Sequence, residues 1–222
     1  MQDMVVSLLR HSVACAFCPV GAASHVSEGG QCPMVDRRKA AGSCLYLGGA
    51  PADTIYFVKH GAVALTRAAG DGEGSPHAVR RAGSFLGLEA ILQPTYLDSA
   101  RAITDVTVCA TSRAQMLGWL DRMGTARVVL DSVLHAIAGD NTGRAQTDGN
   151  APQRVARWLR DTTKQKKLPR SILAGLLGMK PETLSRALAA LARFGAITLT
   201  RTRMDVRDGA LLAAVAEGRA RV

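Results

Sequence analysis

Cysteines are the most reactive side chains of this 222-residue chain, and three of the five lie within its first 32 residues. Cys15 and Cys18 belong to a Cys-Ala-Phe-Cys-Pro element, which brings two thiolates to one side of a tight loop. Two more thiolates would complete a soft four-sulfur site, suited to an iron–sulfur cluster or to zinc. Paired thiols in a segment with few core-forming residues are hard to explain by packing alone. The other cysteines are Cys32, Cys44 and Cys109.

The setting of these cysteines also favours metal or redox chemistry. Residues 4–9 form a short apolar run without a basic region or a cleavage pattern, and no stretch is long enough to span a membrane. We therefore expect a cytoplasmic protein without membrane contact, where cysteine sets bind metal or act in redox chemistry more often than they form structural disulfides. A thiol–disulfide switch is one alternative to a metal. His11 and His25 are alternative ligands for zinc or haem.

A second kind of chemistry is expected near the C-terminus. The segment 168–197 predicts a helix, a tight turn at Gly178 and a second helix that opens at Pro181. The apolar face of the first helix is predicted to comprise Ile172, Leu173, Leu176 and Leu177. Leucines line one face of the second helix, at Leu184, Leu188 and Leu191. Its polar face would bring an acceptor, a hydroxyl and a guanidinium to base edges in the major groove, through Glu182, Ser185 and Arg186.

Two short strands and a last helix are expected after this pair. Gly195 ends the second helix, residues 197–201 and 204–206 alternate as strands do, and residues 209–217 form an apolar helix. Together these elements predict a winged helix-turn-helix. Basic residues on it are expected to contact DNA phosphates and so position the protein without specifying sequence. They are Lys180, Arg193, Arg201, Arg203 and Arg207.

The positive charge of the chain is concentrated in the same region. Residues 151–222 hold 15 basic and 5 acidic side chains, so the whole net charge of +10 falls there. Its coincidence with the helix-turn-helix pattern is what phosphate neutralisation requires. We therefore predict a DNA-binding protein rather than an enzyme. The N-terminal part offers only Glu89 with Asp98 as a nearby carboxylate pair for acid–base catalysis.

The remaining elements must position these two sites. Short alternating segments with frequent turn signals predict an antiparallel β-roll, with strands at 55–58, 62–66, 78–80 and 106–109 and a helix at 113–123. The predicted fold class is α+β. The expected domains are a Cys-containing leader at 1–41, the β-roll at 42–124, a dimerisation helix and hinge at 125–148, and the winged helix-turn-helix at 149–222.

Residues 125–143 are predicted to form one long helix. Its apolar stripe has no obvious partner in its own chain, which favours a two-fold dimer seam, although the helix could instead cap the roll. A two-fold axis would double the DNA site into a palindrome. The stripe consists of Val129, Leu130, Val133, Leu134 and Ile137.

From about residue 42 to its end, this order of elements resembles the Crp/Fnr superfamily of bacterial transcription regulators. Residues 55–61 (IYFVKHG) are similar to the strand-turn signature of the family, and residues 82–87 (AGSFLG) to its next glycine-containing segment. Residues 182–186 (ETLSR) resemble the recognition helix of the Fnr branch, which is associated with TTGAT-type half-sites. The resemblance implies a homodimer that binds palindromic double-stranded DNA and works with RNA polymerase.

The Fnr branch also holds an oxygen-labile [4Fe-4S] cluster, with a cysteine group before the roll and one cysteine inside it. Carried over to this chain, the resemblance implies that the ligands are Cys15, Cys18, Cys32 and Cys109, with Cys44 as a substitute for Cys32. Zinc is the alternative metal. The implied mechanism is a switch in which oxygen or nitric oxide attacks the cluster and weakens dimerisation or DNA affinity.

Cyclic-nucleotide binding is not expected. In members that bind cyclic AMP, a Gly-Glu pair holds the ribose and an Arg-Ser pair holds the phosphate. Here Leu88 follows Gly87, and Asp98 precedes Ser99, so an acid replaces the cation that would neutralise the phosphate. Arg101 could compensate from the same side of a strand. A haem or another small effector in the roll is a weaker alternative to the metal switch.

Overall fold

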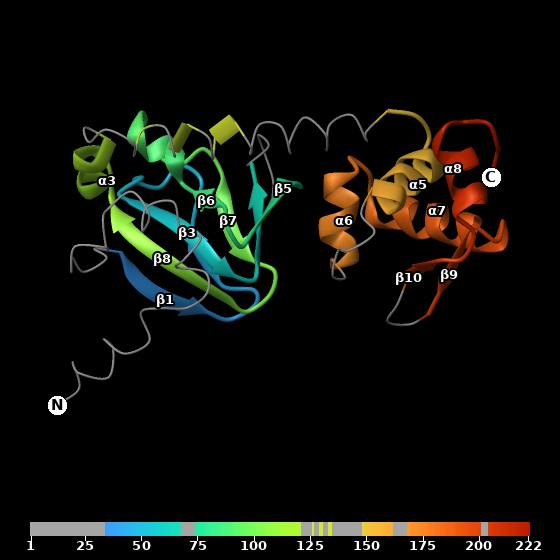
Figure 1. Ribbon diagram of the computed structural model, residues 1–222, viewed down its shortest axis with the longest axis horizontal. Helices are drawn as coiled ribbons and strands as arrows, with labels where there is room; N and C mark the ends of the chain where they lie inside the picture. The colour runs from blue at the N-terminus through green and yellow to red at the C-terminus, as the bar shows by residue number, and fades with distance from the viewer. Residues whose placement is uncertain are drawn as a thin grey trace. The chain divides into compact units, whose positions relative to one another are not determined.

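The computed structural model describes residues 34–67, 74–120, 126, 129–130, 133–134, 148–161, 168–200 and 204–222 (Figure 1). These residues form two compact units, a β-rich unit followed by a mainly helical unit. Each unit has its own cluster of buried apolar side chains. The predicted α+β fold, with an antiparallel roll before a helix-turn-helix, is confirmed.

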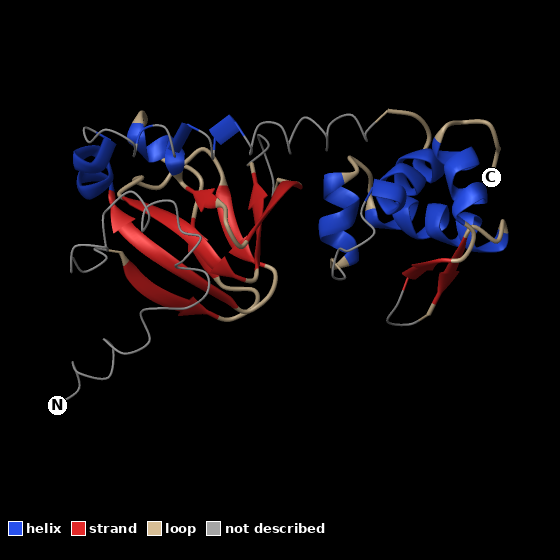
Figure 2. Cartoon of the chain, in the orientation of Figure 1, coloured by secondary structure: helices blue, strands red, loops and turns tan. Residues whose placement is uncertain are grey.

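The β-rich unit contains two four-stranded sheets, drawn in red in Figure 2. The first has the strand order β1 (Val35–Lys39), β8 (Val106–Ser112), β3 (Thr54–His60) and β6 (Phe85–Leu86). The second has the order β2 (Cys44–Tyr46), β7 (Ser99–Ala102), β4 (Ala62–Thr66) and β5 (Pro76–Arg81). Gly61 joins β3 to β4 with φ +89°, and a Cβ there would overlap the Asp105 carbonyl oxygen. Only glycine fits this turn.

All four predicted strands lie within observed strands, and the prediction for residues 62–66 coincides with β4. The strand expected to carry Ser99 and Arg101 is β7, whereas β1 and β6 were not predicted. Every residue of β1 is exposed, so this edge strand lacks the apolar alternation that marks a half-buried strand. Because β1 pairs with β8 along its whole length, the roll begins at Val35, ahead of the boundary expected at residue 42.

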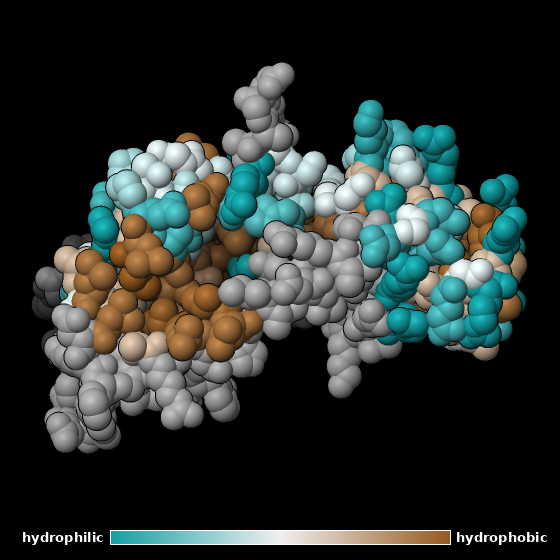
Figure 3. Space-filling view, turned by 90° about the horizontal axis from the view of Figure 1, so that it is seen from above, coloured by the Kyte–Doolittle hydropathy of each residue, from teal (hydrophilic) through white to brown (hydrophobic). Residues whose placement is uncertain are grey.

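Helical segments complete this unit, namely the 3₁₀ turn η2 (Leu88–Ile91) and α3 (Arg113–Leu120). Residues 126, 129–130 and 133–134 are also helical, whereas Ile137 of the predicted stripe lies outside the described residues. Val129 is buried in the core of the roll, while Leu130 and Leu134 are 58% and 56% exposed. Apolar side chains also gather on the surface of this unit in the view of Figure 3. One face of the predicted helix therefore packs on the roll, and its next face stays apolar and open.

The helical unit consists of α5 (Ala151–Asp161), α6 (Arg170–Leu176), α7 (Pro181–Arg193), the antiparallel pair β9 (Ile197–Leu199) and β10 (Met204–Val206), and α8 (Gly209–Ala216). Helix α5 packs against both α7 and α8. The core of the helical unit is apolar. Its most buried side chains include Leu173, Leu177, Leu184, Leu191, Ile197 and Leu212. Asp208 caps the N-terminus of α8, because its Oδ1 accepts hydrogen bonds from Ala210 N and Leu211 N at 2.9 Å.

Candidate nucleic-acid interface and cysteine site

Helix α7 separates its apolar and polar residues as the sequence predicted. Leu184, Leu188 and Leu191 are at most 2% exposed and form part of the core. The three predicted base-contacting residues all lie on the exposed face of the helix: Glu182, Ser185 and Arg186. Spacings of three and four residues place them on the same side within the first two turns. The helix thus presents an acceptor, a hydroxyl and a guanidinium to solvent at its N-terminal end.

The turn before α7 is held by a residue that the sequence analysis did not single out. Gly178 has φ +60°, as the predicted turn requires. Arg154 of α5 donates from Nη1 to the carbonyl oxygens of Leu177 at 3.0 Å and of Gly178 at 3.3 Å. On α6 the predicted apolar stripe is only partly buried, since Leu173 and Leu177 lie in the core but Ile172 and Leu176 are half-buried. Ala174 completes the buried face in their place.

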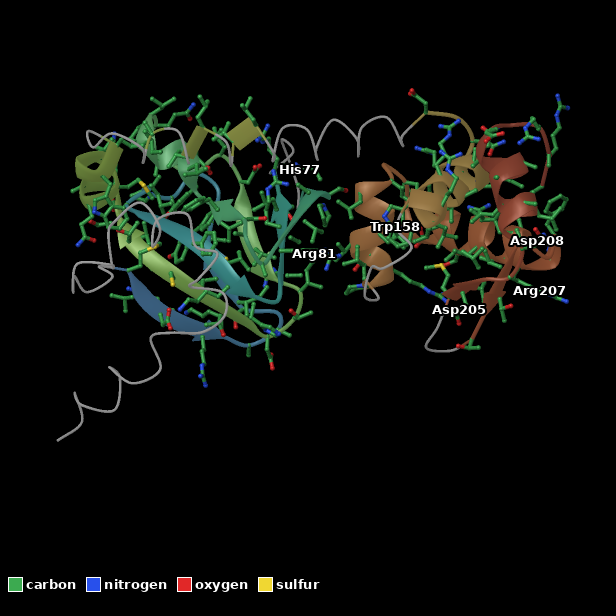
Figure 4. The ribbon with its side chains drawn as sticks, in the orientation of Figure 1. His77, Arg81, Trp158, Asp205, Arg207 and Asp208 are labelled. Atoms are coloured by element: carbon green, nitrogen blue, oxygen red, sulfur yellow. The ribbon has the colours of Figure 1, made fainter. Side chains whose placement is uncertain are left out.

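Several predicted phosphate contacts are exposed. Lys180 precedes the first turn of α7, and Arg193 ends its last turn. Arg201 and Arg203 lie outside the described residues. Figure 4 shows Arg207 at the junction of β10 and α8, and its side chain is exposed. Hydrophilic side chains dominate the surface of this unit in Figure 3.

Cys109 lies in the middle of β8, directly opposite Asp36 of β1 and Phe57 of β3. It is 4% exposed, and its Sγ donates to Asp36 Oδ1 at 3.0 Å. The same carboxylate accepts from Lys59 Nζ at 2.7 and 3.0 Å, and the Lys59 side chain is 5% exposed. The thiol therefore shares a carboxylate with a buried ammonium.

The surroundings of Cys109 keep its thiol protonated. Burial raises the pKa of Cys109, and the hydrogen bond to Asp36 raises this pKa further, while the Lys59 ammonium opposes both effects. Cys15, Cys18 and Cys32 lie outside the described residues. Within the part of the chain that the structure describes, no three His, Cys, Asp or Glu side chains form a group that could hold a metal ion. Of the four predicted cluster ligands, Cys109 is the one that the structure describes.

Cys44, the predicted substitute ligand, belongs to a different sheet from Cys109. It lies on β2, opposite Arg101 of β7. Its Sγ donates to the carbonyl oxygen of Tyr46, two residues along the same strand, at 3.1 Å. The hydrogen bonds of the two thiols share no residue.

The raised pKa of Cys109 makes a direct prediction for the metal-free, reduced protein. Because the thiolate is the reactive form, we expect iodoacetamide at pH 8 to modify Cys109 about tenfold or more slowly than a free cysteine. Peptide mapping by mass spectrometry at timed intervals would measure this rate. Protein unfolded in guanidinium is the control and should react at the ordinary rate. Equal rates in folded and unfolded protein would contradict the buried, protonated thiol.

Several polar side chains of the segment 87–99, where the resemblance locates a cyclic nucleotide, form hydrogen bonds within the roll. Asp98 accepts from Arg67 Nε at 2.9 Å and from Nη2 at 3.2 Å. Tyr96 stacks on Tyr46 with 3.9 Å between ring centroids, and its hydroxyl donates to the Thr54 carbonyl oxygen at 2.6 Å. Burial raises the pKa of Tyr96 to about 12, so this hydroxyl stays protonated.

Two further residues of this region are engaged in the same way. Glu89 Oε1 accepts from Leu97 N at 3.3 Å, and Arg101 Nη1 donates to the Gly42 carbonyl oxygen at 2.9 Å. The residue that could have compensated for Asp98 is therefore bonded to the β1–β2 turn.

We accordingly expect 1 mM cyclic AMP to leave the melting temperature unchanged. A ligand with a Kd of about 10 µM would stabilise the roll by roughly 2.7 kcal/mol at that concentration, a shift of several degrees. Differential scanning fluorimetry against 5′-AMP as control would measure it. A saturable rise specific to the cyclic form would refute the expectation.

Comparison with known proteins agrees with both units. Residues 36–123 match the model of the cyclic nucleotide-binding domain, and residues 153–215 match the Crp-like helix-turn-helix domain. No curated protein sequence matches the chain.

Solved structures of the same architecture are similar to the chain. FixK2 from Bradyrhizobium japonicum is 22% identical, with a TM-score of 0.70 over 82% of this chain and 96% of its own. A transcriptional regulator of the CRP family from Thermus thermophilus is 23% identical, with a TM-score of 0.69 and the same coverage. A putative cyclic nucleotide binding protein from Ruegeria pomeroyi is 28% identical, with a TM-score of 0.57 over 83% of this chain and 86% of its own.

A β-roll joined to a helix-turn-helix with an exposed polar recognition face defines a class of two-domain DNA-binding regulators. Within that class, the combination of a cyclic nucleotide-binding domain with a Crp-like helix-turn-helix domain is that of the Crp/Fnr family of transcription regulators. Among the residues that the structure describes, no helix combines the length and apolar character needed to cross a bilayer.

Proposed function

We propose that this regulator senses oxygen or nitric oxide through a [4Fe-4S] cluster and changes its DNA affinity when the cluster is lost. Four thiolates would hold the cluster, from Cys15, Cys18, Cys32 and Cys109. The observation that carries the proposal is the position of Cys109, whose buried thiol contacts Asp36 on β1, the strand that follows the cysteine-containing leader. The cluster supplies an iron–sulfur centre that oxygen and nitric oxide attack.

To hold the cluster, Cys109 would have to lose the proton that it donates to Asp36, because thiols ligate metal as thiolates. Asp36 is the fourth residue after Cys32, so the two Cα atoms are at most about 14 Å apart. Asp36 and Cys109 are directly opposite on paired strands, so this bound also limits how far Cys32 can lie from Cys109. The buried Lys59 ammonium beside this site would offset negative charge on a ligating thiolate. Cys44 suits the role less well, because it bonds within β2 of the other sheet.

The same core connects the thiol to the predicted dimer helix. Strand β8 carries Cys109 and leads directly into α3, and the core that contains Cys109 also contains Met116 and Trp119 of α3 and Val129. A shift of β8 would therefore alter the packing of Val129 and, with it, the exposed Leu130 and Leu134. A coupling of about 3 kcal/mol between the two packings is enough for roughly a hundredfold change in DNA affinity.

The DNA-binding part of the proposal rests on α7. Glu182, Ser185 and Arg186 would contact the base edges of TTGAT-like half-sites, and the basic residues around them would contact phosphates. A two-fold dimer would bind two such half-sites as a palindrome, and RNA polymerase would be the further partner. The exposed pair Leu130 and Leu134 supports the dimer seam.

The test is a visible spectrum with iron, sulfide and zinc analysis of protein purified without air, followed by DNA binding before and after exposure to air. We expect a broad brown absorption, equal amounts of iron and sulfide, and weaker binding after the colour bleaches. Colourless protein that contains zinc, or that responds only to thiol reductants, would refute the cluster. The outcome would then favour a structural zinc or a thiol–disulfide switch in the same DNA-binding regulator.

A further inference from the structure

A network of polar contacts holds the entry to the helical unit at the start of α5. Asn150 and Gln153 form reciprocal hydrogen bonds, in which Asn150 N donates to Gln153 Oε1 at 2.9 Å and Gln153 N donates to Asn150 Oδ1 at 3.0 Å. This is a capping box, which satisfies two backbone N–H donors at the start of α5 and holds Asn150 against the first turn of the helix.

Arg157, one turn further along α5, ties that entry to the far end of the unit. Its Nη1 donates to the Asp148 carbonyl oxygen at 2.7 Å, and its Nε donates to the Ala216 carbonyl oxygen at 2.9 Å. Ala216 ends α8, so a single planar guanidinium bridges the incoming chain and the C-terminus of the last helix. A lysine side chain has a single nitrogen, so it cannot donate from two separate nitrogens as Arg157 does.

Two glycines make room for the same network. Gly149 has φ +86°, and a Cβ there would lie 2.5 Å from Gln153 Oε1. Gly218 has φ +75°, and its Cβ would lie 2.9 Å from Gln153 Nε2. Residues 148–150 are therefore hydrogen-bonded into the helical unit, whereas residue 148 was expected to belong to the hinge.

We propose that Arg157 is a positioning residue that sets the spacing of the two DNA half-sites. This inference rests on dimeric binding to a palindrome but not on the cluster. Each recognition helix of a dimer must meet the major groove about one helical turn, or roughly 34 Å, from the other. The direction in which the chain enters each helical unit limits where its recognition helix can lie. A unit released at residues 148–150 would still bind one half-site but would lose the preference for a particular spacing.

The experiment compares the full-length protein with Arg157→Lys and Gly149→Ala, which disturb the network from opposite sides. The matched control is Arg160→Gln on the same helix, where the side chain is 44% exposed and lies 3.5 Å from Glu217. The probes are a palindrome selected by the unmodified protein from random-sequence DNA, the same palindrome with its spacer changed by one and two base pairs, and a duplex with one half-site.

We expect both network variants to bind the single half-site as the unmodified protein does. Their affinity for the selected palindrome should fall about tenfold, because the second half-site is met at a lower effective concentration. Their affinities for the altered spacers should become similar to one another. Arg160→Gln should keep the original preference.

Retention of the full spacing preference in both variants would overturn the proposal. An equal loss on the half-site and on the palindrome would overturn it too, because Arg157 would then act on DNA contact or folding. If the unmodified protein selects no palindrome, dimeric recognition itself fails, which is separable from a failure confined to Arg157.

Discussion

Replacing Cys109 by serine is expected to abolish the bound iron and sulfide and to lower the operator affinity of the anaerobic protein about a hundredfold. Serine keeps a hydroxyl that can donate to Asp36 Oδ1, the acceptor of the thiol, so the pairing of β1 with β8 should survive. The loss would therefore report the missing ligand rather than an unfolded roll. Metal analysis and the absorption spectrum measure the loss of iron and sulfide, and DNA titration under nitrogen measures the operator affinity.

Cys44→Ser is the matched control for this experiment. The Cys44 thiol donates to a carbonyl oxygen of its own strand, and the variant should keep colour and DNA affinity. If Cys44→Ser bleaches the protein while Cys109→Ser does not, the ligand set proposed above is wrong. A matching melting temperature for the two variants would show that the roll tolerates both changes.

Arg186→Ala should reduce the preference for a matched over a scrambled palindrome by about 1–3 kcal/mol, or roughly 5- to 150-fold. The reason is that the exposed guanidinium in the first two turns of α7 is expected to contact a base edge in two places, which alanine cannot do. The residue is outside the core, so the melting temperature should hold. Competition binding with both duplexes at one salt concentration provides the measurement.

The comparison variant for Arg186 is Arg193→Ala, at the other end of the same helix. Arg193 is expected to contact a phosphate, so this variant should bind all sequences more weakly by the same factor. The slope of log affinity against log salt should fall in magnitude by about one. If the unmodified protein binds matched and scrambled palindromes equally, sequence-specific recognition is refuted for the whole helix.

Local sequence patterns were sufficient to predict most elements of the helical unit. Pro181 does begin α7, Gly178 and Gly195 do have positive φ, and residues 204–206 are the second strand of the wing. Each of these features depends on residues within a few positions of one another, so that helical periodicity, capping and turn chemistry act in the sequence itself.

The roll was predictable only where a strand has a buried face. Residues 62–66 are almost entirely apolar and form β4, whereas Val35–Lys39 form an exposed edge strand that no apolar pattern marks. The missed β1 is the strand that supplies Asp36 to Cys109. For this reason the sequence could nominate the cysteine but not the groups around it.

The sequence by itself determined that a basic C-terminal part contains a helix-turn-helix, that Glu182, Ser185 and Arg186 share one helix face, and that the chain has the cysteines for a four-sulfur site. The tertiary structure alone decided which groups meet across long separations. Asp36 lies 73 residues from Cys109, and Arg157 lies 59 residues from Ala216. Such contacts depend on which strands pair, in which register, and on how helices pack. These choices minimise the free energy of the whole unit and leave no local trace in the sequence.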